Sequence, residues 1–151
     1  MYRIRTPHYS KRDPEMRWSL PDRVFFACGA CHILAHAFLE AHDGTERIVW
    51  WLKPNEGLPG HHIVVDGEAW IFDYHGFSCP NRYWSHMWRK ARQLWPGWDA
   101  TLVRLPPEVL VSETASRAFD AALWLREPGQ FLHDPLPRAR AYVQRFSTPF
   151  D

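Results

Sequence analysis

The chain has 151 residues, the length of one ordinary domain, and its 46% hydrophobic residues argue for a packed globule and against intrinsic disorder. Its formal net charge of +1 gives no overall field that would attract nucleic acid or a membrane surface, and no apolar run is long enough to cross a bilayer. We therefore expect a single domain over residues 1–151 without a nucleic-acid or membrane partner, while the oligomeric state stays open.

The first 22 residues are polar and are interrupted by Pro7, Pro14 and Pro21, so we expect an irregular arm over residues 1–22. This arm lacks the apolar core of a secretory signal. Three cysteines is an odd number, and without an export signal we expect reduced thiols. The sequence thus indicates a cytoplasmic protein, or an effector that is secreted without a Sec-type signal.

Hydrophobic periodicity and turn signals divide the rest of the chain into helices and strands. Apolar residues at helical spacing predict a helix from Cys31 to about His42, ended by Asp43-Gly44. Strands are expected at 47–52, 61–65, 69–74 and 100–105, further helices at 82–94, 115–125 and 138–145, a loop at 76–81 and a proline-interrupted tail at 130–151.

Cys31 stands at the start of the first of these helices, directly after Cys28-Gly29-Ala30. The free N–H groups and the positive dipole end of a helix N-terminus favour a thiolate over a thiol. The position therefore predicts a lowered pKa and makes Cys31 a candidate nucleophile.

Residues 61–73 predict a β-hairpin, because Asp66-Gly67 is a strong two-residue turn signal. Side chains alternate between the faces of a strand, so this turn places Asp73 on the same face as His62, as a diagonal neighbour. His61 falls on the opposite face. A four-residue loop would preserve this relation, whereas a three-residue loop would select His61 instead.

Cysteine, histidine and aspartate in this order predict a catalytic triad. A thiolate attacks a carbonyl carbon, an imidazole keeps the thiol ionised and later protonates the leaving group, and a carboxylate orients the ring. We assign these roles to Cys31 as nucleophile, His62 as general base and acid, and Asp73 as orienting group.

Three further residues are candidates for substrate binding. Trp50 and Trp51 are adjacent on a predicted strand and point to opposite faces, so that one of them can line a cleft near the histidine. His75 follows the aspartate by two positions and shares its face, which makes it another polar candidate at the same site.

This pattern resembles the transglutaminase-like core of the papain-like cysteine enzymes. The matching features are residues 28–31 at the head of the helix, the strand at 47–50, and His62 and Asp73 on the hairpin. Residues 28–31 also fit the papain-type C-G-[SA]-C pattern. Two features depart from the papains: His32 stands where they have an aromatic residue, and no glutamine lies shortly upstream of the nucleophile.

The resemblance implies an α+β fold with a papain-like core, in which a helix headed by the nucleophilic cysteine packs on an antiparallel sheet. It implies acyl transfer from an amide or thioester, by hydrolysis, deamidation or transfer to an amine. The enzyme would be a cysteine hydrolase or acyltransferase that needs no cofactor and no metal. Its partner would be a protein, a peptide or a small amide.

Other interpretations of the same residues stay open. Cys28 and Cys31 have zinc-ligand spacing, and His32 and His36 lie one helical turn apart, which would suit a non-enzymatic binding module supported by zinc. Cys28-x-x-Cys31-His32 also matches the c-type haem attachment motif, and C-x-x-C matches a redox pair.

The aromatic and basic segment 83–98 would suit a partner or nucleic-acid surface. We favour instead an amphipathic helix that uses tryptophan for the core and arginine for the solvent side.

Overall fold

The computed structural model describes residues 2–42 and 47–149, and within these ranges it shows an α+β fold with six α-helices and one antiparallel sheet. The strands are β1 Ile48–Pro54, β2 His62–Asp66, β3 Ile71–Asp73, β4 Gly76–Ser78 and β5 Ala100–Leu105, in the spatial order β4-β3-β2-β1-β5. The helices are α1 Pro14–Trp18, α2 Asp22–Ala27, α3 Cys31–Ala41, α4 Pro80–Leu94, α5 Glu113–Phe119 and α6 Leu136–Val143, with 3-10 helices at Pro107–Val111 and Pro128–Gln130. None of these described helices has the length and apolar character needed to span a membrane.

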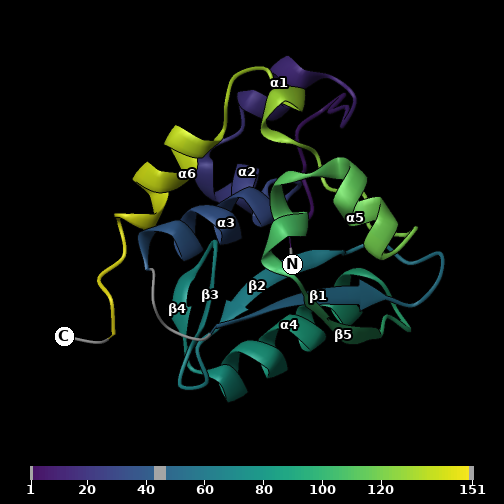
Figure 1. Cartoon of the computed structure of the whole chain (residues 1–151). Helices are drawn as coiled ribbons and strands as arrows, with labels where there is room; N and C mark the ends of the chain where they lie inside the picture. Colours follow the sequence, from purple (N-terminus) through teal and green to yellow (C-terminus); the bar gives the residue numbers. More distant parts are fainter. Residues whose placement is uncertain (1, 43–46, 150–151) are drawn as a thin grey trace.

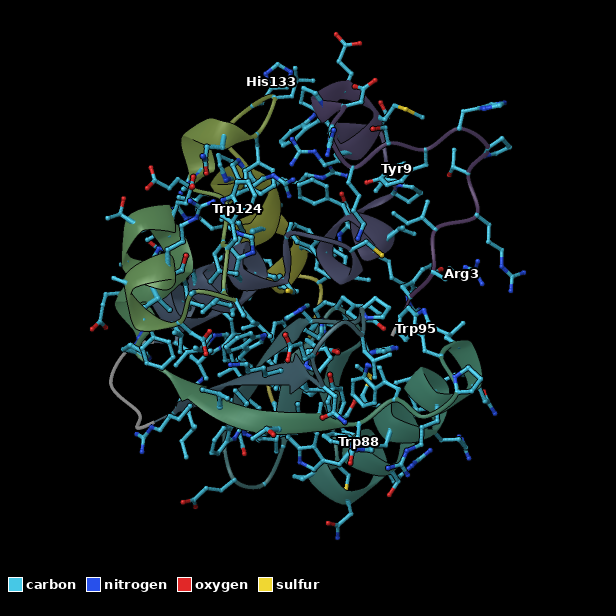
Figure 2. The ribbon with its side chains drawn as sticks, turned by 90° about the vertical axis from the view of Figure 1, so that its right-hand side faces the viewer. Arg3, Tyr9, Trp88, Trp95, Trp124 and His133 are labelled. Atoms are coloured by element: carbon cyan, nitrogen blue, oxygen red, sulfur yellow. The ribbon has the colours of Figure 1, made fainter. Side chains whose placement is uncertain are left out.

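The sheet separates two layers of helices (Figure 1). Helix α3 lies on one face together with α1, α2, α5 and α6, and α4 alone covers the other face. In Figure 2, Trp88 accordingly lies on the α4 side and Trp124 on the side of α5 and α6. This arrangement gives the sheet two buried faces, which is why its central strands are apolar at almost every position.

Strand alternation assigns each side chain to one of these layers. On the α3 side, Phe38 stacks on Phe72 with ring centroids 4.2 Å apart. On the α4 side, a smaller cluster includes Val64 and Ile71 from the sheet. Helix α4 meets this cluster with residues spaced four apart along one stripe, namely Tyr83, Met87 and Ala91.

The connection between β2 and β3 is longer than the predicted two-residue turn. Val65 pairs with Phe72 and Asp66 pairs with Ile71, so that residues 67–70 form the connection. The predicted pairing of Val65 with Glu68 is therefore wrong.

The reason lies in the packing of Trp70 over Gly67. A Cβ atom at Gly67 would lie 2.1 Å from Cζ2 of Trp70, so the indole occupies the space beside the glycine, and the Gly67 N–H donates to the Trp70 carbonyl at 2.9 Å across the four-residue connection. Because the connection has four residues, the alternation still places His62 and Asp73 on one face.

The predicted elements differ from the structure mainly at their ends. The loop expected at 76–81 contains the three-residue strand β4, which is too short to show a periodic pattern. The helix expected at 115–125 ends at Phe119, and Leu123 and Leu125 instead enter the core from irregular backbone.

The N-terminal segment is more ordered than predicted, and the helix predicted at 138–145 within the C-terminal tail is confirmed as α6. The arm at 1–22 contains α1, whose first turn is capped by the Asp13 carboxylate, and the tail at 130–151 contains α6. The predicted helix end at Asp43-Gly44 lies outside the described residues.

Candidate active site

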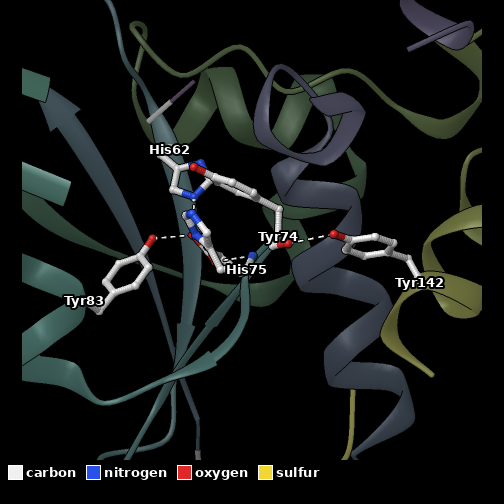
Figure 3. A network of polar contacts seen from close by, with 6 residues as sticks. His62, Tyr74, His75, Tyr83 and Tyr142 are labelled. Carbon is white, nitrogen blue, oxygen red and sulfur yellow. Dashed lines mark hydrogen bonds and ion pairs between the residues drawn. The ribbon is translucent and has the colours of Figure 1, made fainter. Parts of the chain in front are cut away.

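His62 and Asp73 form a buried pair across neighbouring strands (Figure 3). His62 Nε2 lies 3.1 Å from Asp73 Oδ2, and the two side chains are 2% and 1% exposed. A carboxylate can only accept, so Nε2 carries the proton and donates it. Nδ1 of His62 makes no hydrogen bond to any residue in the described part of the chain.

The Asp73 carboxylate is the centre of this polar network. It accepts hydrogen bonds from the backbone N–H of His75 at 2.8 Å, from the His75 ring at 3.0 Å and from the Tyr83 hydroxyl at 2.6 Å. Burial by itself would raise the pKa of Asp73, but the hydrogen bonds from His62 and His75 outweigh it and lower the pKa. The group is therefore a carboxylate at neutral pH.

The environment of His62 favours a neutral imidazole. Burial lowers its pKa, while the hydrogen bond and charge of Asp73 oppose this effect without reversing it. A neutral ring that donates through Nε2 has an unprotonated Nδ1. That nitrogen is thus a proton acceptor at neutral pH.

Cys31 is the first residue of α3, at the predicted place. Burial raises the pKa of its thiol to about 11, although the backbone N–H groups of Ile63, His32 and Cys31 itself lower it. The predicted lowering is therefore wrong. The thiol borders a small cavity whose lining is apolar except for Asp73 and Tyr74, and the loss of solvation there exceeds the effect of the helix terminus.

The thiol and the imidazole are neighbours without a direct bond. Helix α3 and the His62–Asp73 pair belong to opposite faces of the sheet, and no hydrogen bond joins Cys31 to His62 within residues 2–42 and 47–149. The thiol nevertheless lies close to the strand that carries His62, because it faces the backbone N–H of Ile63, the residue that directly follows His62.

The pairing of β2 with β3 does not extend to His62. Pairing of β2 with β3 begins at Val65 and Phe72, and toward the His62 end the strands separate (Figure 3). Cys31 and Asp73 line the same small cavity there, together with Tyr74. The Tyr74 ring meets the His62 ring edge-on, with centroids 5.4 Å apart.

The candidate substrate-binding residues occupy three different environments. Trp51 is fully buried on the α3 side and donates from Nε1 to His61 Nδ1 at 3.2 Å, so it is a core residue. Trp50 lies half-buried on the α4 side and donates to Asp66 at 2.9 Å. Of the three, only His75 lies beside Asp73 and borders open cavities.

The structure also bears on the alternative interpretations. All three cysteines are free thiols, and no group of three or more metal-ligating side chains is placed to hold a metal among the residues described. His32, which haem attachment would require as an iron ligand, is buried with Nε2 2.8 Å from the Arg126 carbonyl. Helix α4 is amphipathic, as predicted, but its buried side consists of Tyr83, Met87 and Ala91, and Trp84 and Trp88 are only partly buried.

Sequence reasoning missed the role of Tyr83. Its place in the apolar stripe of α4 indicates a core residue, but nothing local shows that its hydroxyl meets a carboxylate on β3. Tyr74 was missed for the same reason, since its contact with His62 depends on the separation of the strands.

Comparison of the chain with protein-family models, with curated proteins and with solved structures found no match. The resemblance to the transglutaminase-like core therefore stays a prediction. The chemistry of the site follows from the side chains and distances of this chain alone.

Proposed function

We propose that this protein is a thiol-dependent acyl-transfer enzyme acting on an amide or thioester. Cys31 is the nucleophile, His62 the general base and acid, and Asp73 the orienting group. The supporting observation is the buried hydrogen bond from His62 Nε2 to Asp73, which sets the tautomer in which Nδ1 is a base. On this proposal the domain is a small papain-like enzyme of the transglutaminase-like type.

The two pKa directions favour a mechanism that starts from a neutral pair. The pKa of Cys31 is raised and that of His62 is lowered, so the proton rests on sulfur at neutral pH. As Sγ bonds to the carbonyl carbon, His62 Nδ1 takes the thiol proton, and N–H groups at the start of α3 stabilise the oxyanion. The imidazolium then protonates the departing amine or thiol, and water or an amine releases the acyl group from sulfur.

The thiol and ring must come within hydrogen-bonding distance for this step. Catalytic hydrogen bonds often tighten only in the substrate complex. Rotation of the Cys31 side chain toward Asp73, which lines the same small cavity and is hydrogen bonded to His62, would bring the thiol closer to the histidine.

A second candidate is a binding module in which the thiol is inert. The observation that favours it is the poorly solvated thiol beside Leu34 and Phe72, whose pKa burial raises to about 11. In that case the His62–Asp73 pair would serve packing alone.

Acylation by a small activated ester distinguishes the two candidates. We expect p-nitrophenyl acetate to place an acetyl group on Cys31, located by mass spectrometry, and His62→Gln to slow this step by about a hundredfold. Cys79→Ser is the matched control, since Cys79 is an exposed free thiol and its loss leaves acylation of Cys31 unchanged. Acetylation that spares Cys31, or that proceeds equally fast in folded His62→Gln, identifies the binding module.

The pH profile of acylation tests the neutral pair separately. Because Nδ1 must be unprotonated, the rate should rise through a pKa below the usual value of about 6.5 and level off near neutrality. A rate that keeps rising toward the thiol pKa of about 11 would show attack by a preformed thiolate and would contradict this mechanism.

A further inference from the structure

Two open cavities meet at His75 and His86. Each has a volume of about 840 Å³, and these two histidines line both of them. The two rings lie edge to face with centroids 6.0 Å apart. We refer to the two joined cavities as the His75 groove. Their volumes lie in the range of ligand-binding pockets.

The groove is lined by cations and by no acidic residue. The first cavity is bordered by Arg3, Arg5, Arg23 and Lys90, and the second by Arg82 and Arg89. None of these six side chains forms an ion pair with a carboxylate of the described residues. Since the chain as a whole has a net charge of only +1, this unpaired positive charge is a local property of the groove.

Helix α4 presents part of this charge as a stripe. Residues 82, 86, 89, 90 and 93 follow helical spacing and line the groove, on a side of α4 that adjoins the buried residues Tyr83, Met87 and Ala91. Solvent-facing helices commonly mix charges of both signs at spacings of three and four. Helix α4 has no acidic residue, so its packing on the sheet does not explain the stripe.

The groove borders the proposed reaction centre. His75 is hydrogen bonded to Asp73 (Figure 3). Tyr74 lines both the first cavity and the small cavity beside Cys31. The N-terminal arm forms the other wall, and Figure 2 shows Arg3 extending from this arm on the same side of the molecule as Trp95 at the end of α4. A ligand in the groove would therefore contact His75 and Tyr74, the residues that connect the groove to Asp73 and to the cavity beside Cys31.

We propose that the His75 groove binds an acidic peptide segment, which is the substrate of the acyl transfer proposed above, and in this respect the inference rests on that function. Arginine side chains bind carboxylates through paired N–H groups, and an unpaired cationic lining selects a ligand with several negative charges. A peptide also carries the amide carbonyl that the thiol would attack. Glutamates or aspartates on either side of that amide would occupy the two cavities.

Binding is measurable without catalysis. A fluorescein-labelled peptide with glutamates flanking a glutamine should bind the full chain, and its affinity should fall as the salt concentration rises to roughly 0.3 M. A peptide with glutamines in place of the glutamates should not bind. A single-stranded oligonucleotide of equal charge is the competing ligand, and tighter binding of the oligonucleotide would overturn the assignment to a peptide.

Charge reversal locates the binding surface. Arg89→Glu and Lys90→Glu should each weaken peptide binding by about fivefold or more. Arg104→Glu is the matched control, because Arg104 is exposed on β5, at the opposite edge of the sheet from β4. Groove variants that bind like the wild type would overturn the proposal even if Cys31 is acylated. If the wild-type chain binds the acidic peptide but Cys31 is not acylated, the groove is supported and the acyl-transfer function is rejected.

Discussion

The two faces of the sheet bury very different side chains. Under α3 the contacts are apolar and aromatic, as in the stack of Phe38 on Phe72. Under α4 the apolar cluster is smaller, and at its end Asp73 binds His62 and Tyr83 in a site that is almost closed to solvent.

The two faces of the sheet therefore have different roles, one in stabilising the fold and one in positioning polar groups. An apolar contact stabilises roughly in proportion to the area that it buries and tolerates small shifts. A buried carboxylate must have its partners at hydrogen-bonding distance, since an unpaired charge in the interior is costly. The α3 face thus supplies much of the folding free energy, and the α4 face fixes the tautomer and position of one imidazole.

The largest expected effect is on the apolar face. Phe38→Ala should reduce the free energy of unfolding by about 4 kcal/mol, because the fully buried ring leaves a cavity between α3 and the sheet. Denaturation in urea measures this loss. In the control Phe119→Ala, where the side chain is 43% exposed, the loss should stay below about 1 kcal/mol. Equal losses would mean that the α3 face does not dominate stability.

Removing the carboxylate tests the polar face. Asp73→Ala should cost about 3 kcal/mol, since it leaves the donors of His62, His75 and Tyr83 without their acceptor. Asp73→Asn should cost less, because its amide oxygen still accepts. The folded pKa of Asp73 is lowered, so its contribution is complete above the unfolded value of about 3.9 and declines as the pH falls toward the folded value. An Asp73→Ala protein as stable as the wild type would remove the distinction between the faces.

The α3 face has one buried imidazole, which makes it sensitive to acid. Burial lowers the pKa of His32 from 6.5 to about 4, so the unfolded chain takes up a proton first as the pH falls. Stability from His32 is complete above pH 6.5, and about 2 kcal/mol should be lost between neutrality and about pH 5. His32→Gln should flatten this part of the profile in urea titrations at several pH values. The lowered pKa of His62 also makes the fold less stable in acid. If His32→Gln loses stability with falling pH as steeply as the wild type, His32 is not the source of the acid sensitivity.

The smallest effect is expected from one hydroxyl. Tyr83→Phe keeps the ring in its cluster and removes the donor at 2.6 Å from Asp73, which should cost about 1.5 kcal/mol. The burial of Tyr83 and the charge of Asp73 raise the hydroxyl's pKa well above its usual value, so the loss should be constant between neutral and moderately alkaline pH. A loss that vanishes in that range would contradict this assignment.

Several features of the site were predictable from local pattern. Apolar spacing placed a helix start at Cys31, and strand alternation placed His62 and Asp73 on one face. The shared face of His62 and Asp73 was predicted correctly although the turn was not, because a connection of four residues leaves the same side chains on the same face as a connection of two. The length of that connection was not predictable, since it depends on Trp70 packing over Gly67.

The order of residues along this chain determined which side chains share a strand face and which residue begins the central helix, because both follow from backbone periodicity. The tertiary structure alone decided that α4 covers the His62–Asp73 pair, that the Cys31 thiol is poorly solvated, and that cations gather around His75. Solvation and charge at a site depend on which distant segments surround it, and sequence spacing carries no record of that environment.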